Sequence, residues 1–220
     1  GGPASSTENN ILNRKWLEEF GGLLGMRVSD MIGFDGIEKK HLINYIYPSD
    51  DELSEIGVTG IFLGHYLPWD GLSNALVSIA NGFTSFYKTV EGSMVNYENL
   101  DNYQTGIHDY FKFIKFGFGR ATDITSLHIR RNRISREEGL QIVKKLDGKF
   151  PWTYLDKPLD EILSPLNISI DEFIKICDQF TNKKIFKTDG KGNLKKDSKN
   201  TSFLFIISLF ANFIANEKPL

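Results

Sequence analysis

The sequence has a single cysteine, Cys177, among its 220 residues. One thiol excludes both an intramolecular disulfide and a four-cysteine zinc site within this chain. The chain shows no secretory signal at its start, and its longest apolar run falls short of the roughly 20 residues that a membrane span needs. We therefore expect a cytoplasmic protein with no membrane span.

Metal-binding patterns are also missing. The four histidines show no ligand spacing with carboxylates, so no metal site is expected; they are His41, His65, His108 and His128. A net charge of −2 and a pI near 6.1 argue against a general nucleic-acid binder. Against this near-neutral background, residues 108–136 hold seven Lys or Arg and only two Asp. Such a concentration indicates an anionic ligand rather than general solubility.

Apolar periodicity and capping residues predict a mainly α chain with a few short strands. We expect helices over 11–24, 38–47, 49–56, 71–80, 105–118, 121–132, 135–146, 169–180 and, at the end, 203–214. A buried strand is expected over 58–64, from its apolar, β-branched start. Residues 1–10 read as a flexible lead-in, 11–182 as a mostly helical region, and 183–220 as a loose tail or hairpin with a short apolar terminal helix.

The helix expected from Thr105 carries an apolar stripe, formed by Ile107, Tyr110, Phe111, Ile114 and Phe118. Beside it runs a polar stripe of His108, Lys112 and Lys115. Asp109 can pair with Lys112 or orient His108, which makes His108 and Asp109 the candidate catalytic pair for acid–base work. A buried, hydrogen-bonded histidine is the other interpretation of His108.

Two glycines, Gly117 and Gly119, end this helix and allow a tight turn or a close approach to a ligand. Arg120 then begins the next helix, where free N–H groups and the helix dipole favour an anion. We predict that Lys115, Arg120 and those N–H groups hold a phosphate or carboxylate, with Lys112 and Asp123 nearby. The alternative is a helix corner with its phenylalanines in the core and its charges in solvent.

A second candidate follows the expected strand, in the segment 64–70. Tyr66 and Trp69 offer flat faces for a sugar or a base, and Asp70 offers a carboxylate for hydroxyls. The alternative is a helix start with Asp70 as the cap and Trp69 as a core residue. Both interpretations stay open at this point.

Several long segments resemble the C-terminal half of the N-acetyl sugar amidotransferases. They are LNRKWLEEFGGLLGM at 12–26, IYPSDDEL at 46–53, GVTGIFLGHYLPWDG at 57–71, NYQTGIHDYFKFIKFGFGRATD at 102–123 and SREEGLQIVKKLDGKFP at 135–151. The acidic helix after Ser169 extends the resemblance, which covers most of the chain, roughly from the opening Gly-Gly to Asp189, and includes long ungapped runs. The apolar tail after about Asn200 has no counterpart.

The resemblance implies the C-terminal portion of a PP-loop, adenine nucleotide α-hydrolase-like enzyme. Such enzymes use ATP with Mg to convert a sugar acetamido group to an acetamidino group, with ammonia from a glutaminase and a cyclase-like partner subunit. The family acts in bacterial lipopolysaccharide O-antigen or flagellin-glycan synthesis. An acetamido sugar or nucleotide sugar would be the substrate.

One departure from the family is large. The Ser-Gly-Gly-x-Asp-Ser type nucleotide loop and the cysteine pairs that look like zinc ligands are absent from this sequence. We therefore expect a C-terminal half that needs a missing N-terminal half for ATP, with zinc confined to that half, and that is inactive alone. The alternative function is a noncatalytic docking domain whose basic face binds partner subunits. The two differ in where Lys115, Arg120 and Asp123 point. A concave pocket beside Tyr66 and Trp69 would favour the enzyme, and a flat, convex basic face would favour docking.

Overall fold

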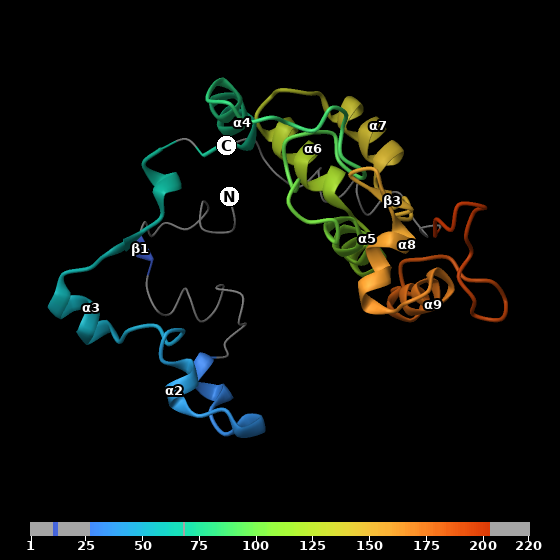
Figure 1. The fold of residues 1–220 in the computed structure, drawn as a ribbon. Coiled ribbons are helices and arrows are strands. Elements are labelled where there is room, and N and C mark those ends of the chain that lie inside the picture. The colour runs from blue at the N-terminus through green and yellow to red at the C-terminus, as the bar shows by residue number, and fades with distance from the viewer. Residues whose placement is uncertain (1–10, 13–26, 68, 203–220) are drawn as a thin grey trace. The chain divides into compact units, whose positions relative to one another are not determined.

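The computed structural model describes residues 11–12, 27–67 and 69–202 of the chain. The chain divides into two compact units, residues 1–82 and 83–220 (Figure 1). Helices dominate both units and strands are few and short, as the sequence predicts. The expected terminal helix over 203–214 lies outside the described residues.

The N-terminal unit is a series of short elements. Its α-helices are α2 (Lys39–Leu42), α3 (Asp50–Ile56) and α4 (Gly71–Ala80), and its strands are β1 (Ile11–Leu12) and β2 (Gly60–Ile61). Three 3₁₀ helices span Val28–Met31, Phe34–Gly36 and Leu63–His65. The two strands pair antiparallel, with Ile11 opposite Ile61.

Local signals decide which expectations hold in this unit. Ser49 caps α3 by accepting from the backbone N–H of Glu52, and Gly57 ends the helix with φ 76°. Both ends of α3 were therefore predictable from the sequence. The helix expected over 38–47 is confined to α2, although no proline interrupts it before Pro48.

Two predictions about apolar runs in this unit are wrong. The strand expected over 58–64 shortens to β2, and Ile61 is half exposed rather than buried. Ile11 and Leu12, expected at the start of a helix, form β1 instead, because they pair with β2. The rest of that expected helix, 13–24, lies outside the described residues. Apolar periodicity does not reveal such pairing with a distant segment.

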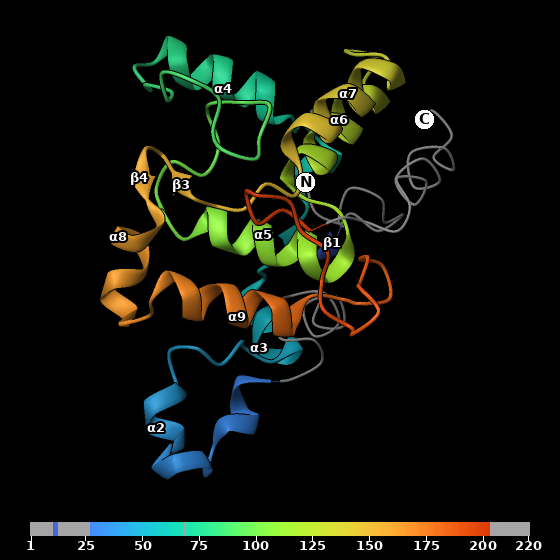
Figure 2. The same ribbon diagram turned by 90° about the vertical axis from the view of Figure 1, so that its right-hand side faces the viewer.

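The C-terminal unit is built on helices joined by one hairpin. Its helices are α5 (Thr105–Phe116), α6 (Arg120–Arg130), α7 (Arg136–Leu146), α8 (Leu159–Leu163) and α9 (Ile170–Phe180), with a 3₁₀ turn over Ser164–Leu166. Strands β3 (Thr153–Tyr154) and β4 (Lys157–Pro158) form an antiparallel hairpin. Helix α5 packs beside α9, and α6 beside α7 (Figure 2).

Most helix ends in this unit follow their capping residues. Ser135 and Glu138 form the predicted capping box of α7. Ser169 caps α9 by accepting from the N–H of Glu172, but this cap lacks the predicted second bond, from the Ser169 N–H to the Glu172 carboxylate. Gly117, with φ 83°, ends α5 and donates its N–H to the Phe113 carbonyl at 2.7 Å. These local contacts explain why the predicted boundaries lie within two residues of the observed ones.

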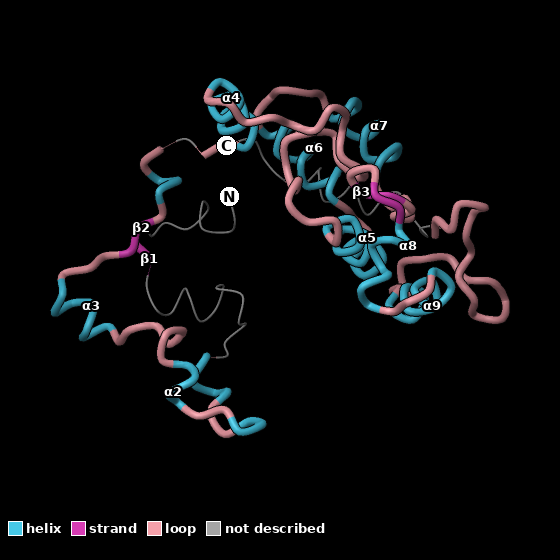
Figure 3. Tube along the Cα trace, viewed as in Figure 1, coloured by secondary structure: helices cyan, strands magenta, loops and turns pink. Residues whose placement is uncertain are grey.

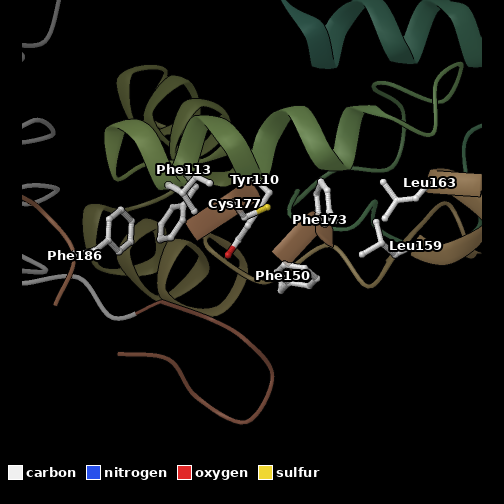
Figure 4. Packing of buried hydrophobic residues seen from close by; sticks show 9 residues of the cluster. Tyr110, Phe113, Phe150, Leu159, Leu163, Phe173, Cys177 and Phe186 are labelled. Carbon is white, nitrogen blue, oxygen red and sulfur yellow. The ribbon is translucent and has the colours of Figure 1, made fainter. Parts of the chain in front are cut away.

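The main core lies between α5, α8 and α9 (Figure 4). Its buried members are Tyr110, Phe113, Ile114, Phe150, Leu159, Leu163, Phe173, Cys177 and Phe186. Tyr110 and Ile114 come from the predicted stripe of α5, while Phe113 is buried although it was not assigned to that stripe. The ring of Phe113 packs edge-on to Phe186, with their centroids 5.4 Å apart. Phe116, in contrast, is 65% exposed, so it does not fill the core of the α5–α6 corner.

Two stretches without helix flank this core. Residues 83–104 form a long loop, drawn in loop colour before α5 (Figure 3). Val90 anchors the loop because it is buried in a second apolar cluster with Tyr154 and Ile162. At the other end of the unit, residues 183–202 form what we call the lysine meander. It is held by isolated antiparallel bridges between Thr188 and Leu194 and between Lys196 and Ser202.

Candidate functional site

A cavity of about 340 Å³ opens within the C-terminal unit. Three parts of the chain form its walls: the loop 88–92, the α5–α6 corner, and the segment 146–154 that runs from the end of α7 into β3. Its lining combines charged side chains, aromatic rings and glycine backbone. The charged members are Lys88, Glu91, Asp109, Arg120, Asp147 and Lys149.

An ion pair crosses the α5–α6 corner inside this cavity. The Arg120 guanidinium donates from Nε to Asp109 Oδ2 at 3.1 Å and from Nη2 to Asp109 Oδ1 at 3.3 Å. Both side chains are largely shielded, with 13% of Asp109 and 26% of Arg120 exposed. Burial opposes the charge on Arg120, but the hydrogen bond and the negative charge of Asp109 outweigh it and raise the pKa of Arg120. The two hydrogen bonds therefore hold the guanidinium and the carboxylate, both charged, in a fixed orientation in the cavity wall.

The start of α6 is occupied by a carboxylate of the chain itself. Asp147 accepts from the N–H of Gly119 at 2.9 Å, from the N–H of Ala121 at 3.0 Å, and from Thr122 Oγ1 at 2.6 Å. The sequence predicts an anion at these N–H groups, and the group that the structure places there is Asp147. Sequence reasoning missed this residue because its partners lie 25 to 28 positions earlier in the chain. No local pattern signals such a distant cap.

Gly119 is required for this arrangement. A Cβ at position 119 would lie 2.7 Å from Asp147 Oδ1, closer than real side-chain contacts come. Burial raises the pKa of the Asp147 carboxyl, although its bonds from Thr122, Gly119 and Ala121 favour the charged form. The sequence predicts that a glycine at the α5–α6 corner lets a ligand approach closely. Gly119 does admit a carboxylate, but this carboxylate belongs to Asp147 at the end of α7 and not to a ligand.

Aromatic side chains form the opposite part of the lining. Tyr154 is 2% exposed and donates its hydroxyl to the Asn99 carbonyl at 3.2 Å. Burial raises the pKa of Tyr154 to about 12, so its hydroxyl remains a donor throughout the neutral range. Gly106 allows α5 to approach this ring, because a Cβ there would come within 2.6 Å of it. Trp152 is 41% exposed and offers an accessible flat face to the cavity.

A charged group fixes the hairpin turn beside these rings. Leu155 and Asp156 both have positive φ, at 48° and 64°, which is uncommon for residues other than glycine. The N–H of Leu155 donates to Glu91 Oε2 at 2.9 Å, and the Asp156 carboxylate accepts from Lys88 and Tyr87. The loop 88–92 is thereby fastened to the β3–β4 turn, so Lys88 and Glu91 are held at the cavity.

The predicted site residues of the α5–α6 region fall into two groups. Asp109, Gly119 and Arg120 line the cavity. His108 does not line it: its side chain is 75% exposed, and its Nδ1 lies 3.2 Å from Asp109 Oδ1. The interpretation of His108 as a buried histidine is therefore wrong. Its role as a catalytic residue with Asp109 stays a prediction.

The other basic residues of this region meet partners of their own. Lys112 forms an ion pair with Asp123 on α6 and lies over the Phe118 ring. The ammonium of Lys115 lies over the Phe180 ring, 4.9 Å from its centroid. Gly117 serves as the left-handed end of α5. Of the two lysines and Arg120, the structure brings only Arg120 to the cavity.

The second candidate segment belongs to the N-terminal unit. Asp70 is buried and caps α4, accepting from the N–H and the hydroxyl of Ser73 at 3.2 Å and 2.8 Å. Tyr66 and Trp69 are each 55% exposed, so the reading of Trp69 as a core residue is wrong. Their exposed rings remain candidates for a sugar face, while the Asp70 carboxylate serves as the helix cap that the alternative reading expects.

The described part of the chain holds neither a metal cluster nor a membrane-spanning helix. Its His, Cys, Asp and Glu residues form no group of three or more that could hold a metal ion. Within the same residues, no helix is long and apolar enough to cross a membrane.

Comparison with known protein families identifies a matching family. A family model described as "LPS biosynthesis protein WbpG-like, C-terminal domain" matches residues 81–199, which is more than half of the chain. Every residue that lines the cavity lies within this span, whereas Tyr66, Trp69 and Asp70 lie before it. No curated protein matches the chain significantly.

Proposed function

The chain belongs to the WbpG-like family of LPS biosynthesis proteins, and from this membership we propose that it is part of a sugar amidotransferase. In this proposal the whole enzyme converts an acetamido group of a sugar to an acetamidino group during synthesis of a bacterial surface polysaccharide or flagellin glycan, in the cytoplasm. The resemblance to the N-acetyl sugar amidotransferases supports the reaction, and the family match supports its place in LPS biosynthesis.

The observation that carries the proposal for this chain is the cavity of the C-terminal unit. Its volume of about 340 Å³ suits one sugar ring with its substituents. The exposed face of Trp152 can stack on the C–H groups of a sugar, while Lys88, Lys149 and the Asp109–Arg120 pair can bond its hydroxyl and carbonyl oxygens. We propose that this cavity binds the acetamido sugar.

The position of Arg120 bears on the alternative of a docking domain. A docking face would present Arg120 to solvent on a convex surface. Instead its guanidinium lies in the cavity wall with 26% of the side chain exposed and is held by Asp109. This placement favours the binding-site interpretation over the docking interpretation.

The chemistry of the whole reaction needs more than this cavity. Replacing an amide oxygen by nitrogen requires an activated oxygen and a source of ammonia, which we propose are supplied through ATP with Mg and by glutaminase and cyclase-like subunits. The Ser-Gly-Gly-x-Asp-Ser type nucleotide loop of the amidotransferases is absent from this sequence, and the Asp147 carboxylate is committed to α6. We therefore assign ATP, and any zinc, to residues that this sequence does not contain. The role assigned to this chain is to bind and orient the sugar.

A pair of tryptophan variants tests the location of the sugar. We expect the full chain to bind N-acetylglucosamine or UDP-N-acetylglucosamine in calorimetry. Trp152→Ala should weaken this binding by up to about tenfold, since an aromatic contact contributes about 0.5–1.5 kcal/mol. Trp69→Ala is the matched control, because Trp69 is a similarly exposed ring in the other unit.

The binding of the two variants shows which part of the chain holds the sugar. Loss of binding in Trp152→Ala alone supports the cavity. Loss in Trp69→Ala alone would move the sugar site to the segment 64–70. No binding of either sugar by the folded wild-type chain would contradict a sugar site in this chain and favour the docking domain.

A further inference from the structure

The lysine meander concentrates positive charge in one short segment of the C-terminal unit. Residues 183–199 hold seven lysines and only two aspartates. The meander follows α9 and extends from it as an orange to red loop (Figure 1). Such a charge density needs a physical explanation, because like charges repel at short range.

The strand register sets two of these lysines side by side. Thr188 pairs with Leu194, so Lys187 lies opposite Lys195, and the Lys195 N–H donates to the Lys187 carbonyl at 2.9 Å. Side chains directly opposite in an antiparallel pair lie on the same face, and like charges there are destabilising. A neutral or acidic residue at position 187 or 195 would avoid this repulsion, yet the sequence has lysine at both positions.

The opposite face of the meander explains which way the lysines point. Phe186 is fully buried and Leu194 packs against the main core, and each is a strand neighbour of one of the paired lysines. Because side chains alternate along a strand, Lys187 and Lys195 point away from the core. Lys196, on the core-facing side, is mostly shielded and forms an ion pair with Asp178 of α9.

Two turns of the same geometry add a lysine each. Asp189 accepts from the N–H groups of Lys191 and Asn193 at 2.8 Å and 2.9 Å. Asp197 accepts in the same way from the N–H groups of Lys199 and Thr201, again at 2.8 Å and 2.9 Å. Both aspartates thus bond the backbone, and each turn carries an exposed lysine at its tip. Within the described residues, no ion pair uses Lys187, Lys191, Lys195 or Lys199.

We propose that the lysine meander binds the anionic headgroups of a phospholipid bilayer. Several exposed lysines on one surface form the kind of site that attracts a bilayer carrying acidic lipids. The sequence continues directly from the meander into an uncharged apolar run, Phe203–Ile214. Lysines beside an apolar run are the combination that holds peripheral proteins to such surfaces, whereas an acidic protein or a nucleic acid would need only the charge.

The meander is also fastened to the sugar cavity. The indole Nε1 of Trp152, a cavity-lining residue, donates to the Lys199 carbonyl at 3.1 Å. A bilayer bound by the meander would therefore lie next to the cavity, which suits a family of LPS biosynthesis proteins. The bilayer proposal itself does not depend on the identity of the ligand in the cavity.

Vesicle co-sedimentation of the full chain tests the proposal. We expect binding to phosphatidylcholine vesicles that contain about one quarter phosphatidylglycerol and weak binding to phosphatidylcholine alone. Lys187→Gln with Lys195→Gln should weaken the binding at least tenfold, since each lysine contributes about 1 kcal/mol at an anionic surface. Raising the salt from about 0.1 M to about 1 M should weaken it too, because the Debye length shrinks from about 10 Å to about 3 Å.

The control is a second exposed lysine pair with the same change of charge. Lys144 and Lys145 lie exposed on α7, away from the meander in sequence, and Lys144→Gln with Lys145→Gln should leave binding unchanged. Equal binding to both kinds of vesicle, or equal losses in the two double variants, would overturn the proposal. Preferential binding to polyglutamate or to DNA over the acidic vesicles would overturn it in favour of an acidic protein or a nucleic acid.

Discussion

The substitution Asp147→Asn tests how the cavity corner is held together. The carboxylate accepts three hydrogen bonds through its two oxygens, from Gly119, Ala121 and Thr122. An asparagine keeps one oxygen and turns an NH₂ group toward the remaining donors, so it can satisfy only part of this set. The substitution therefore leaves at least one N–H at the start of α6 without its acceptor.

The expected magnitude follows from two opposing effects. Hydrogen bonds to a charged acceptor contribute about 1.5–3 kcal/mol each, so the loss of one or two would cost up to about 6 kcal/mol. Burial raises the pKa of Asp147, which shows that removing this carboxylate from water offsets part of that gain. We therefore expect Asp147→Asn to lower the free energy of unfolding by about 1–3 kcal/mol.

Urea unfolding of the full chain, followed by circular dichroism, measures this effect. Asp171→Asn is the matched control, because Asp171 lies in the first turn of α9, where Ser169 already provides the cap. The control should change the unfolding free energy by less than about 0.5 kcal/mol. An unfolding midpoint for Asp147→Asn equal to that of the wild type would refute the argument that this carboxylate secures α6.

Two further predictions concern the core next to this corner. Gly148→Ala should destabilise the chain by at least about 1 kcal/mol, because position 148 has φ 77° and a Cβ there would lie 2.4 Å from the Phe113 ring. The control in the same unfolding measurement is Gly190→Ala, since nothing lies within 4 Å of a Cβ at that position. Equal unfolding midpoints for the two variants would contradict the prediction. Burial raises the pKa of Cys177 to about 12 from 9.0, so an unfolded chain ionises this thiol at a lower pH than the folded chain does. Stability from this group is present below pH 9 and should be lost as the pH rises toward 12, at up to about 1.4 kcal/mol per pH unit, and a Cys177→Ser variant with the same slope would contradict this.

Local signals were sufficient to predict much of the fold. Helices α3, α4, α7 and α9 begin at residues whose side chains cap them, and the sequence predicts each start correctly. The stripe of α5 identifies Tyr110 and Ile114 as core residues because helical periodicity is local. The mainly α class of the chain follows from these elements.

Features that depend on distant pairing were not predictable in this way. Strands β1 and β2 exist through pairing across nearly fifty positions, which no local pattern reports. The sequence places Arg120 at a helix start, and the structure adds its pair with Asp109 in the cavity. The rest of the cavity wall comes from Trp152, Tyr154 and the loop 88–92, and a single sequence gives no sign that these segments meet.

The cap of α6 has a consequence for how the C-terminal unit assembles. Asp147 follows α7 in the chain, so the N–H groups at the start of α6 gain their acceptor only after α7 has folded back along α6. Before that moment α6 is an uncapped helix of eleven residues, a length that is marginal in isolation. Helices α6 and α7 therefore gain their stability together and fold cooperatively. Because Asp147 also lines the cavity, the cavity forms only once α6 and α7 have packed together.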